Sequence, residues 1–541
     1  MPVHSVHSTS RRSNMGRRLG AACAIAAIAV TVHPAGTRAQ AGASFEVVEA
    51  TIATVHGAFT SGRLTCRQLV QAYLDRIEAY DKTDPAINSL IVTNPRALGI
   101  ADSLDRRFAR EGLTGPLHCV PTIVKDNFET NDLQTTAGSA ALAGWIPRRD
   151  ATMVARMKAA GAIVLAKSNL AEWAFTPYET VSSILPGYTR NPYDLSRVTA
   201  GSSGGTAAAV AASLGLVGLG SDTGNSIRGP SAHQALFGIR STMGLTSRAG
   251  VVPLNNRADI AGPMARTADD AVRVFQVVAG EDPDDSVTAG ANAKRERDYT
   301  SFLTSGALQG ARIGVLRQAY ERATTDTEVV RVFDRALAEL RAAGATIIDT
   351  VIVDSLGALT RNPNGGCNPF KYDLERYFAA RGEGAPVKTI AEVLSRPGNY
   401  HPTVQSRLEA AQRVTTTPEE TPGCTYREEV VKPRFRAAIT ALMDSLRLDA
   451  LVHPTWSNPP RLIGDLNTPH GDNSQLFSPT SGFPAITVPM GYTRGNTLPA
   501  GMTFLGRAWS EGRLISLAYD YERASHHRRP PAITPPLSAR P

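Results

Sequence analysis

Two glycine-rich turns lie close together in the middle of the chain and restrict its fold more than any other feature. They are residues 200–206 (AGSSGGT) and residues 221–228 (SDTGNSIR), and each carries a serine. A helix of small residues is expected over 207–214 and an apolar strand over 216–220. Strands and helices alternate in this way elsewhere in the chain, which predicts an α/β fold around a mixed β-sheet.

A buried lysine completes a possible catalytic set with the two serines. Lys125 ends a proline-bounded apolar stretch that starts at residue 115 and reads as a strand. A serine hydroxyl is a weak nucleophile until a neighbouring base takes its proton. No histidine occupies a comparable turn, so lysine is the available base. Ser202, Ser226 and Lys125 therefore predict a Ser–Ser–Lys hydrolase.

The net charge of +8 does not indicate an anionic partner. The first 41 residues hold no acidic residue, and their arginines supply +5 of the +8, which leaves +3 for the other 500 residues. No basic block occurs in that remainder, so the sequence gives no support for nucleic acid binding. The five arginines are Arg11, Arg12, Arg17, Arg18 and Arg38.

Residues 1–41 are typical of a cleaved export signal. The arginines precede an apolar run over 19–32, and residues 39–41 (AQA) before Gly42 fit a small-x-small cleavage site. The run is shorter than the ~20 residues needed to span a bilayer. We therefore expect a secreted or periplasmic protein, residues 42–541, with no membrane anchor after processing. General secretion and twin-arginine export both remain open.

Four cysteines remain after the signal. Cys66 and Cys119 lie on apolar stretches and are expected to be buried thiols. Cys367 and Cys424 lie in turn-rich stretches, either as a disulfide in an oxidising compartment or as two unpaired thiols. No spacing resembles a metal site, and no cofactor is implied.

The remainder of the chain reads as one large domain without repeats. Residues 356–424, rich in Pro, Gly and Thr, read as an insertion or a cleft-lining segment, and 458–477 as a cleft rim. Strands are expected over 87–92, 162–166, 310–316, 345–353, 449–454 and 485–490, and helices from a cap at Thr65 and over 95–111, 151–160 and 328–343.

Several stretches together resemble the amidase signature family of serine hydrolases. Residues 201–212 (GSSGGTAAAVAA) and 220–228 (GSDTGNSIR) are similar to the family signature. The similarity continues in 115–127, 135–139, 166–172 and 483–489, so it spans residues 60–525 in register. The resemblance implies the amidase signature fold, with a mixed central sheet covered by helices on both faces.

The resemblance also implies roles for the catalytic residues. Ser226 matches the nucleophile, Ser202 the bridging serine held by a cis peptide, and Lys125 the general base. A lysine can act as a base only when burial lowers its pKa from ~10.4. Val120, Ile123 and Val124 provide such an apolar setting.

The residues around the nucleophile are expected to stabilise charge and to hold the turn. The backbone N–H groups of Thr223, Gly224 and Asn225 lie at a helix start, where an oxyanion can bind. Asp222 and Arg228 are interpreted as a structural pair that braces the turn, and Ser203 as a brace of the other loop. A phosphate-binding loop is the alternative, but the glycine spacing is wrong and no acidic ribose partner follows.

Two positions depart from the family pattern, since Ala200 and Asn225 replace common glycines. Asparagine tolerates unusual backbone angles, so the turn can survive. Lys167 is interpreted as structural. Four aromatic residues form either core or the wall of a substrate cleft, namely Trp173, Phe175, Tyr178 and Tyr188. Three histidines are interpreted as ordinary polar residues, namely His233, His453 and His470.

The sequence thus predicts an exported amidase that cleaves amide C–N bonds through an acyl-enzyme. Residues 506–511 (GRAWSE) and 519–530 look most like the peptide amidases. The substrate is a small amide, either a peptide amide or an aryl or alkyl amide. A carbamate (urethane) or ester hydrolase, one subunit of an amidotransferase, or a non-catalytic binding protein are the alternatives. The protein is expected to be a monomer or a homodimer.

Overall fold

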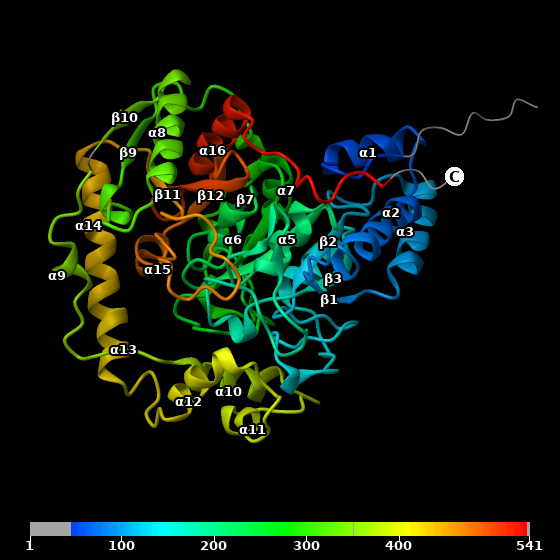
Figure 1. The fold of residues 1–541 in the computed structure, drawn as a ribbon, viewed down its shortest axis with the longest axis horizontal. Helices are drawn as coiled ribbons and strands as arrows, with labels where there is room; N and C mark the ends of the chain where they lie inside the picture. The colour runs from blue at the N-terminus through cyan, green and yellow to red at the C-terminus, as the bar shows by residue number, and fades with distance from the viewer. Residues whose placement is uncertain (1–44, 350, 538–541) are drawn as a thin grey trace, which may run out of the picture. The chain divides into compact units, whose positions relative to one another are not determined.

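The computed structural model describes residues 45–349 and 351–537, which form one α/β domain (Figure 1). The predicted export signal, residues 1–41, lies outside the described residues. Within the described ranges, no helix combines the length and the apolar character needed to cross a bilayer.

A mixed sheet of 11 strands runs through the domain, as predicted, and helices cover both of its faces. Its strand order is β1-β3-β2-β6-β8-β7-β12-β13-β11-β9-β10. Strands β3, β2 and β6 are parallel, and the central strands from β6 to β11 are antiparallel. The strands are β1 (Leu90–Thr93), β2 (Pro121–Lys125), β3 (Ile163–Ser168), β6 (Val217–Asp222), β7 (Phe237–Arg240), β8 (Ile260–Ala265), β9 (Arg312–Val315), β10 (Thr346–Ile348), β11 (Ala450–Pro454), β12 (Ala485–Thr493) and β13 (Leu498–Leu505), with β4 (Arg190–Asn191) and β5 (Asp194–Val198) in a separate pair.

Some helices begin at a side-chain cap. Thr65 caps α2 in a capping box with Gln68, and Asp326 caps α8. The helices are α1 (Ile52–Thr60), α2 (Cys66–Ile77), α3 (Ala97–Glu111), α4 (Thr152–Ala159), α5 (Gly204–Ala211), α6 (Arg228–His233), α7 (Ala268–Val278), α8 (Thr327–Ala342), α9 (Leu356–Thr360), α10 (Phe370–Arg381), α11 (Ile390–Leu394), α12 (Gln405–Gln412), α13 (Pro422–Tyr426), α14 (Lys432–Ser445), α15 (Phe477–Ser481) and α16 (Glu511–Ser525).

The topology brings Lys125 and the turn of Ser226 to the same edge of the sheet. β2 ends at Lys125 and the parallel neighbour β6 ends at Asp222, so the loops after both strands leave from the same edge. The small residues of α5 let it lie close to β6. A Cβ on Gly218 would clash with the Thr206 side chain, and the Thr206 hydroxyl donates to the Leu219 carbonyl at 3.3 Å.

Residues 356–424 carry four helices, α9 to α12, although their composition suggested turns. The group α10–α12 lies at the lower end of the view in Figure 1. This group packs on the rest of the domain through a separate hydrophobic cluster. In that cluster Phe370 and Leu374 contact Trp173 and Phe175. Cys367 and Cys424 form a disulfide, which is the first of the two alternatives that the sequence left open.

The prediction for Cys66 and Cys119 was wrong, because the two residues form a disulfide. Cys119 lies in the turn before β2, with a φ of 54°, and not in the strand itself. Cys66 is the first residue of α2, and this helix packs beside that turn. Both side chains are buried, as expected from the apolar pattern, but the pattern could not show that they meet.

Candidate active site

Lys125 is fully buried at the end of β2 and lies against serine oxygens. Its Nζ is 2.7 Å from Ser202 Oγ, 2.8 Å from Ser221 Oγ and 3.3 Å from the Ser221 carbonyl oxygen. Burial lowers the pKa of Lys125 to about 7, because a charged ammonium is disfavoured away from water. The lysine can therefore lose its proton near neutral pH and act as a base.

The loop of Ser202 has a backbone that explains its glycine-rich sequence. The Gly201–Ser202 peptide bond is cis, as the resemblance implied, and Ala200 has a φ of 61°. This left-handed conformation accounts for the family's glycine at position 200. A Cβ on Gly201 would clash with the Glu179 and Thr176 carbonyls.

Ser203 links the two turns, as the interpretation of this residue as a brace requires. Its hydroxyl donates to the Ser221 carbonyl at 3.2 Å, and its N–H donates to the Ser226 carbonyl at 3.2 Å. The sequence reasoning missed Ser221, whose hydroxyl also accepts a hydrogen bond from Asn127 Nδ2 at 3.0 Å. Asn127 lies two residues after Lys125, just beyond the end of β2. An amide side chain at this short distance from a buried lysine is the sequence signal that points to it.

The turn of Ser226 is held by a buried group of charges. The Asp222 carboxylate lies 3.0 Å from Arg228 Nε and 3.0 Å from Arg240 Nη1. Although burial opposes ionisation, the two guanidinium groups lower the pKa of Asp222 to about 2. The Asp222–Arg228 pair is therefore confirmed as a contact. Arg240, at the end of strand β7, also belongs to this group of charges, but it was not predicted from the sequence.

The backbone of the same turn offers free donors. Among the described residues, no atom accepts a hydrogen bond from the N–H groups of Gly224, Asn225 or Ser226. Thr223 Oγ1 donates to Asp259 Oδ1 at 2.5 Å, which fixes the start of the turn. Unused N–H groups beside a nucleophile are what an oxyanion requires. Ser226 is nearly buried, at 5% exposure.

Asn225 occupies a position where the family commonly has glycine, which suggested a left-handed backbone conformation. Its φ is not positive, so the backbone here does not require glycine. Its side chain is buried against Gly229, where a Cβ would lie 2.8 Å from the Asn225 Cγ. Neither polar atom of its amide has a hydrogen-bond partner among the described residues.

Lys167 has the surroundings of a structural residue. Its Nζ lies 2.8 Å from Asp126 Oδ1 and donates to the carbonyls of Phe128 and Gln134 at 2.9 Å. Burial lowers the pKa of Lys167 and the Asp126 carboxylate opposes this shift, while the surrounding acceptors hold the side chain in place. Burial lowers the pKa of His233 to about 3 and that of His453 to about 4, so both rings are neutral.

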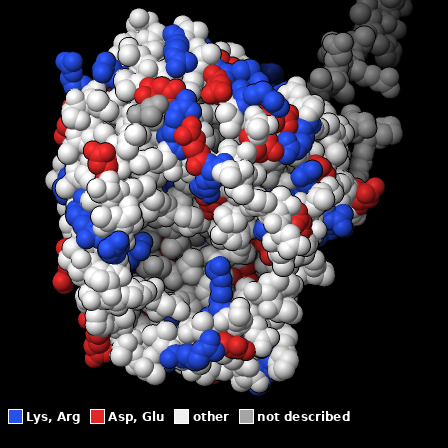
Figure 2. Space-filling view, turned by 60° about the vertical axis from the view of Figure 1, so that its left-hand side comes forward, with Lys and Arg blue, Asp and Glu red and all other residues white. Residues whose placement is uncertain are grey.

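The aromatic residues divide between core and cleft. Trp173 is buried in the core of the α10–α12 group, whereas Phe175 belongs to that core and also lines a cavity of about 320 Å³. Tyr178 stacks on His470 at 4.1 Å between ring centroids. Tyr188 is half-buried. Figure 2 shows that one face of the molecule is hollowed, with basic side chains beside the hollow.

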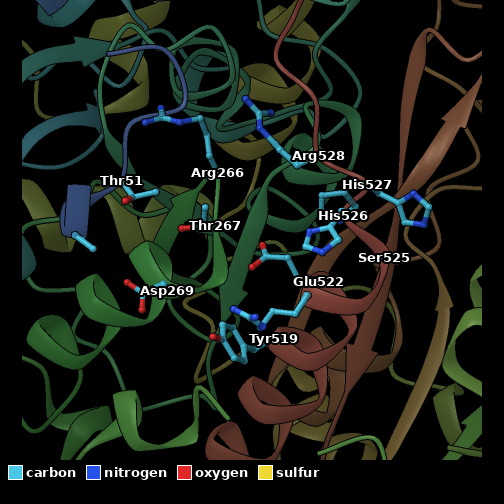
Figure 3. Close-up of a pocket in the computed structure, with 13 residues that line it drawn as sticks. Thr51, Arg266, Thr267, Asp269, Tyr519, Glu522, Ser525, His526, His527 and Arg528 are labelled. Carbon is cyan, nitrogen blue, oxygen red and sulfur yellow. The ribbon is translucent and has the colours of Figure 1, made fainter. Parts of the chain in front are cut away.

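A larger cavity, of about 420 Å³, contains none of the predicted site residues (Figure 3). It lies between the start of α7 and the end of α16. Two of its charged groups are already bound, since Arg528 pairs with Glu49 at 2.7 Å and Glu522 accepts from the Ala268 N–H at 3.0 Å. Ser525, His526 and His527 also line it, but His527 Nε2 is bound to Glu339 Oε2 at 2.8 Å and not to the serine. No group of three potential metal ligands occurs within residues 45–349 and 351–537.

Comparison with known proteins identifies the family. The profile described as "Amidase" matches residues 68–515. A probable amidase of Arabidopsis thaliana is 34% identical over 90% of this chain and 92% of its own length. One subunit of the glutamyl-tRNA(Gln) amidotransferase of Symbiobacterium thermophilum is 32% identical over 88% of this chain and 97% of its own length.

A structural neighbour supports the same assignment. The peptide amidase of Stenotrophomonas maltophilia has a TM-score of 0.78 and 35% identity, over 90% of this chain and 99% of its own. The signature turns, the buried lysine and these similarities agree. The chain belongs to the amidase signature family, a family of amide-hydrolysing enzymes.

Proposed function

We propose that this protein is an exported hydrolase that cleaves amide C–N bonds through an acyl-enzyme on Ser226. The observation that carries the proposal is the buried Lys125, whose pKa is lowered to about 7 and whose Nζ lies 2.7 Å from Ser202 Oγ. A base matched to neutral pH and joined to a serine is the combination that acyl transfer requires.

We infer the reaction from the contact between Lys125 and Ser202 and from the roles that the family assigns to these residues. Neutral Lys125 accepts the proton of Ser202, Ser202 takes the proton of Ser226, and the Ser226 oxygen attacks the amide carbon. The N–H groups of Gly224 and Asn225 donate to the oxyanion. When the C–N bond breaks, the proton returns through Ser202 to the leaving amine. Water then attacks the ester carbon by the same proton route, which releases the acid and restores Ser226.

The substrate class rests on the structural neighbours. A peptide amidase is among them, which favours a peptide amide or an aryl or alkyl amide. Carbamates and esters fit the same chemistry as alternatives. Export rests on residues 1–41, with their arginines, apolar run and cleavage site. Its test is the intact mass of protein from the periplasm or medium, which should begin at Gly42.

The acyl-enzyme proposal is tested with a fluorophosphonate probe on the full chain. The probe should label the wild type at Ser226, and Ser226→Ala should lose both the label and amide hydrolysis. Ser103→Ala, on the outer helix α3, serves as the matched control and should keep both. A label that persists in the Ser226 variant would contradict the assignment of the nucleophile.

A further inference from the structure

The cavity of about 320 Å³ lies next to the nucleophile turn. Thr223 lines it and is three residues before Ser226, so the two Cα atoms are at most about 11 Å apart. A substrate whose amide carbon lies at Ser226 can therefore place another part in this cavity. Its volume is at the lower end of the range for small-molecule pockets.

The cavity has apolar walls that are suited to a ring. Phe175 and Phe370 meet edge to face at 4.6 Å between centroids, and Leu254 lies on the opposite loop. Both phenylalanines are buried in the core of the α10–α12 group, which holds them in place. The Cys367–Cys424 disulfide ties down the segment just before Phe370. The walls are therefore formed before a substrate binds.

An arginine without an acidic partner lies at the rim of this cavity. Arg407, on helix α12, lines the cavity and is exposed to solvent. One of its Nη atoms donates to the Phe175 carbonyl, and its guanidinium is 6.0 Å from the Phe175 ring centroid. Within the described residues it makes no ion pair. A guanidinium has five N–H donors, so most of them remain available.

Three arginines in or beside residues 356–424 pair with carboxylates. Arg376 and Arg257 both bind Glu419, and Arg381 binds Glu129 at 2.6 Å. Arg407 differs from these three in two respects: it has no acidic partner among the described residues, and it lines an apolar cavity. Guanidinium groups pair with carboxylates in a two-pronged geometry, so a carboxylate is the natural ligand.

We propose that this cavity binds an aromatic ring of the amide substrate and that Arg407 binds a carboxylate at the far end of that ring. The inference rests on the amidase function proposed above and specifies its substrate class. The preferred substrates are aryl amides with a para-carboxylate, and the carboxylated ring can belong to the acyl part or to the amine part.

Two matched pairs of substrates distinguish these two arrangements. Benzamide and 4-carboxybenzamide test the acyl part, whereas acetanilide and 4-acetamidobenzoate test the amine part. In the wild type, kcat/KM for the charged member of one pair should exceed that for the neutral member by about tenfold, which is the scale of one charge-assisted hydrogen bond. The preference should fall as ionic strength rises from about 0.1 M to about 1 M, since the screening length shortens from ~10 Å to ~3 Å.

Variants of Arg407 test the residue itself. Arg407→Gln should bring the ratio of kcat/KM between the charged and the neutral substrate from about tenfold to about one. Arg407→Lys should keep part of the preference. Arg413→Gln, at the end of the same helix, is the matched control and should keep all of it.

The outcomes separate this inference from the proposed function. Equal kcat/KM for charged and neutral substrates in the wild type would overturn the inference, as would a preference that survives Arg407→Gln. In both cases amide hydrolysis itself would remain. Absence of hydrolysis with every amide, together with no labelling of Ser226, would overturn the proposed function and the inference with it.

Discussion

The free energy of unfolding should depend less steeply on pH when Lys125 is replaced by methionine. Lys125 is fully buried, and burial lowers its pKa from 10.5 to about 7. In the folded protein the lysine is neutral above about pH 7, whereas in the unfolded chain it stays protonated up to about pH 10.5. Between these values the unfolded state binds one more proton, so raising the pH favours the folded state.

The magnitude follows from the same shift. The full difference in pKa corresponds to about 5 kcal/mol of destabilisation at pH values below about 7, where both states carry the charge. This penalty should decrease by about 1.4 kcal/mol for each pH unit above 7. Methionine also removes the hydrogen bonds to Ser202 and Ser221, but that loss is the same at every pH. The pH dependence therefore isolates the titration of Lys125.

The assay is urea unfolding of the wild type and Lys125→Met at pH 7 and pH 9, followed by tryptophan fluorescence. Over this interval the wild type should gain about 2 kcal/mol relative to the variant, because the folded-state lysine is already about half neutral at pH 7. Lys388→Met, at an exposed lysine, should follow the wild type. If the wild-type and Lys125→Met curves remain parallel between the two pH values, Lys125 does not have a lowered pKa and the argument for a neutral base fails.

Two further predictions concern packing and cross-linking. Gly229→Ala would place a Cβ 2.8 Å from the Asn225 Cγ. Because this clash would displace Ser226, the next residue, we expect about a hundredfold loss of kcat. The double variant Gly229→Ala/Asn225→Gly removes the clash and should recover most of the lost kcat. Equal losses in the single and double variants would refute the contact. Replacing Cys66 and Cys119 together with serine should lower the unfolding free energy by about 4 kcal/mol, measured from the urea midpoint, because the bond closes a loop of 53 residues in sequence separation. A midpoint that does not change would contradict the cross-link.

The sequence allowed much of the site to be predicted, because its parts are local. Residues 200–228 form turn, helix, strand and turn within one short stretch, and the apolar run before Lys125 predicts a buried strand. A turn that needs left-handed backbone angles, as at Ala200, favours glycine, so such turns can be recognised from glycine-rich stretches of sequence. The mixed sheet followed from the alternation of strands and helices. Helix α2 followed from its cap at Thr65.

The parts that escaped prediction depend on contacts between distant segments. Burial of Cys66 and Cys119 could be read from apolar patterns, but their pairing depends on how α2 packs beside the turn before β2. Arg240 joins Asp222 only because β7 and β6 both pair with β8. Helices α10–α12 are stabilised by packing on Trp173 and Phe175, which outweighs the turn-rich composition of the segment.

The two proposals above assign catalysis and substrate choice to different parts of this chain. The nucleophile turn is fixed by the buried Asp222 with its two arginines, and the bridging loop is held by Thr180, which donates to the Ala200 carbonyl at 2.9 Å. The walls of the neighbouring cavity come largely from residues 367–370 and 407–411, which contribute nothing to those contacts. Substitutions in these two stretches can therefore change the shape and charge of the cavity while the buried base and the oxyanion donors stay in place. For this reason a change at Arg407 should alter the ratio of rates between substrates, whereas a change at Lys125 should lower the rates for all of them.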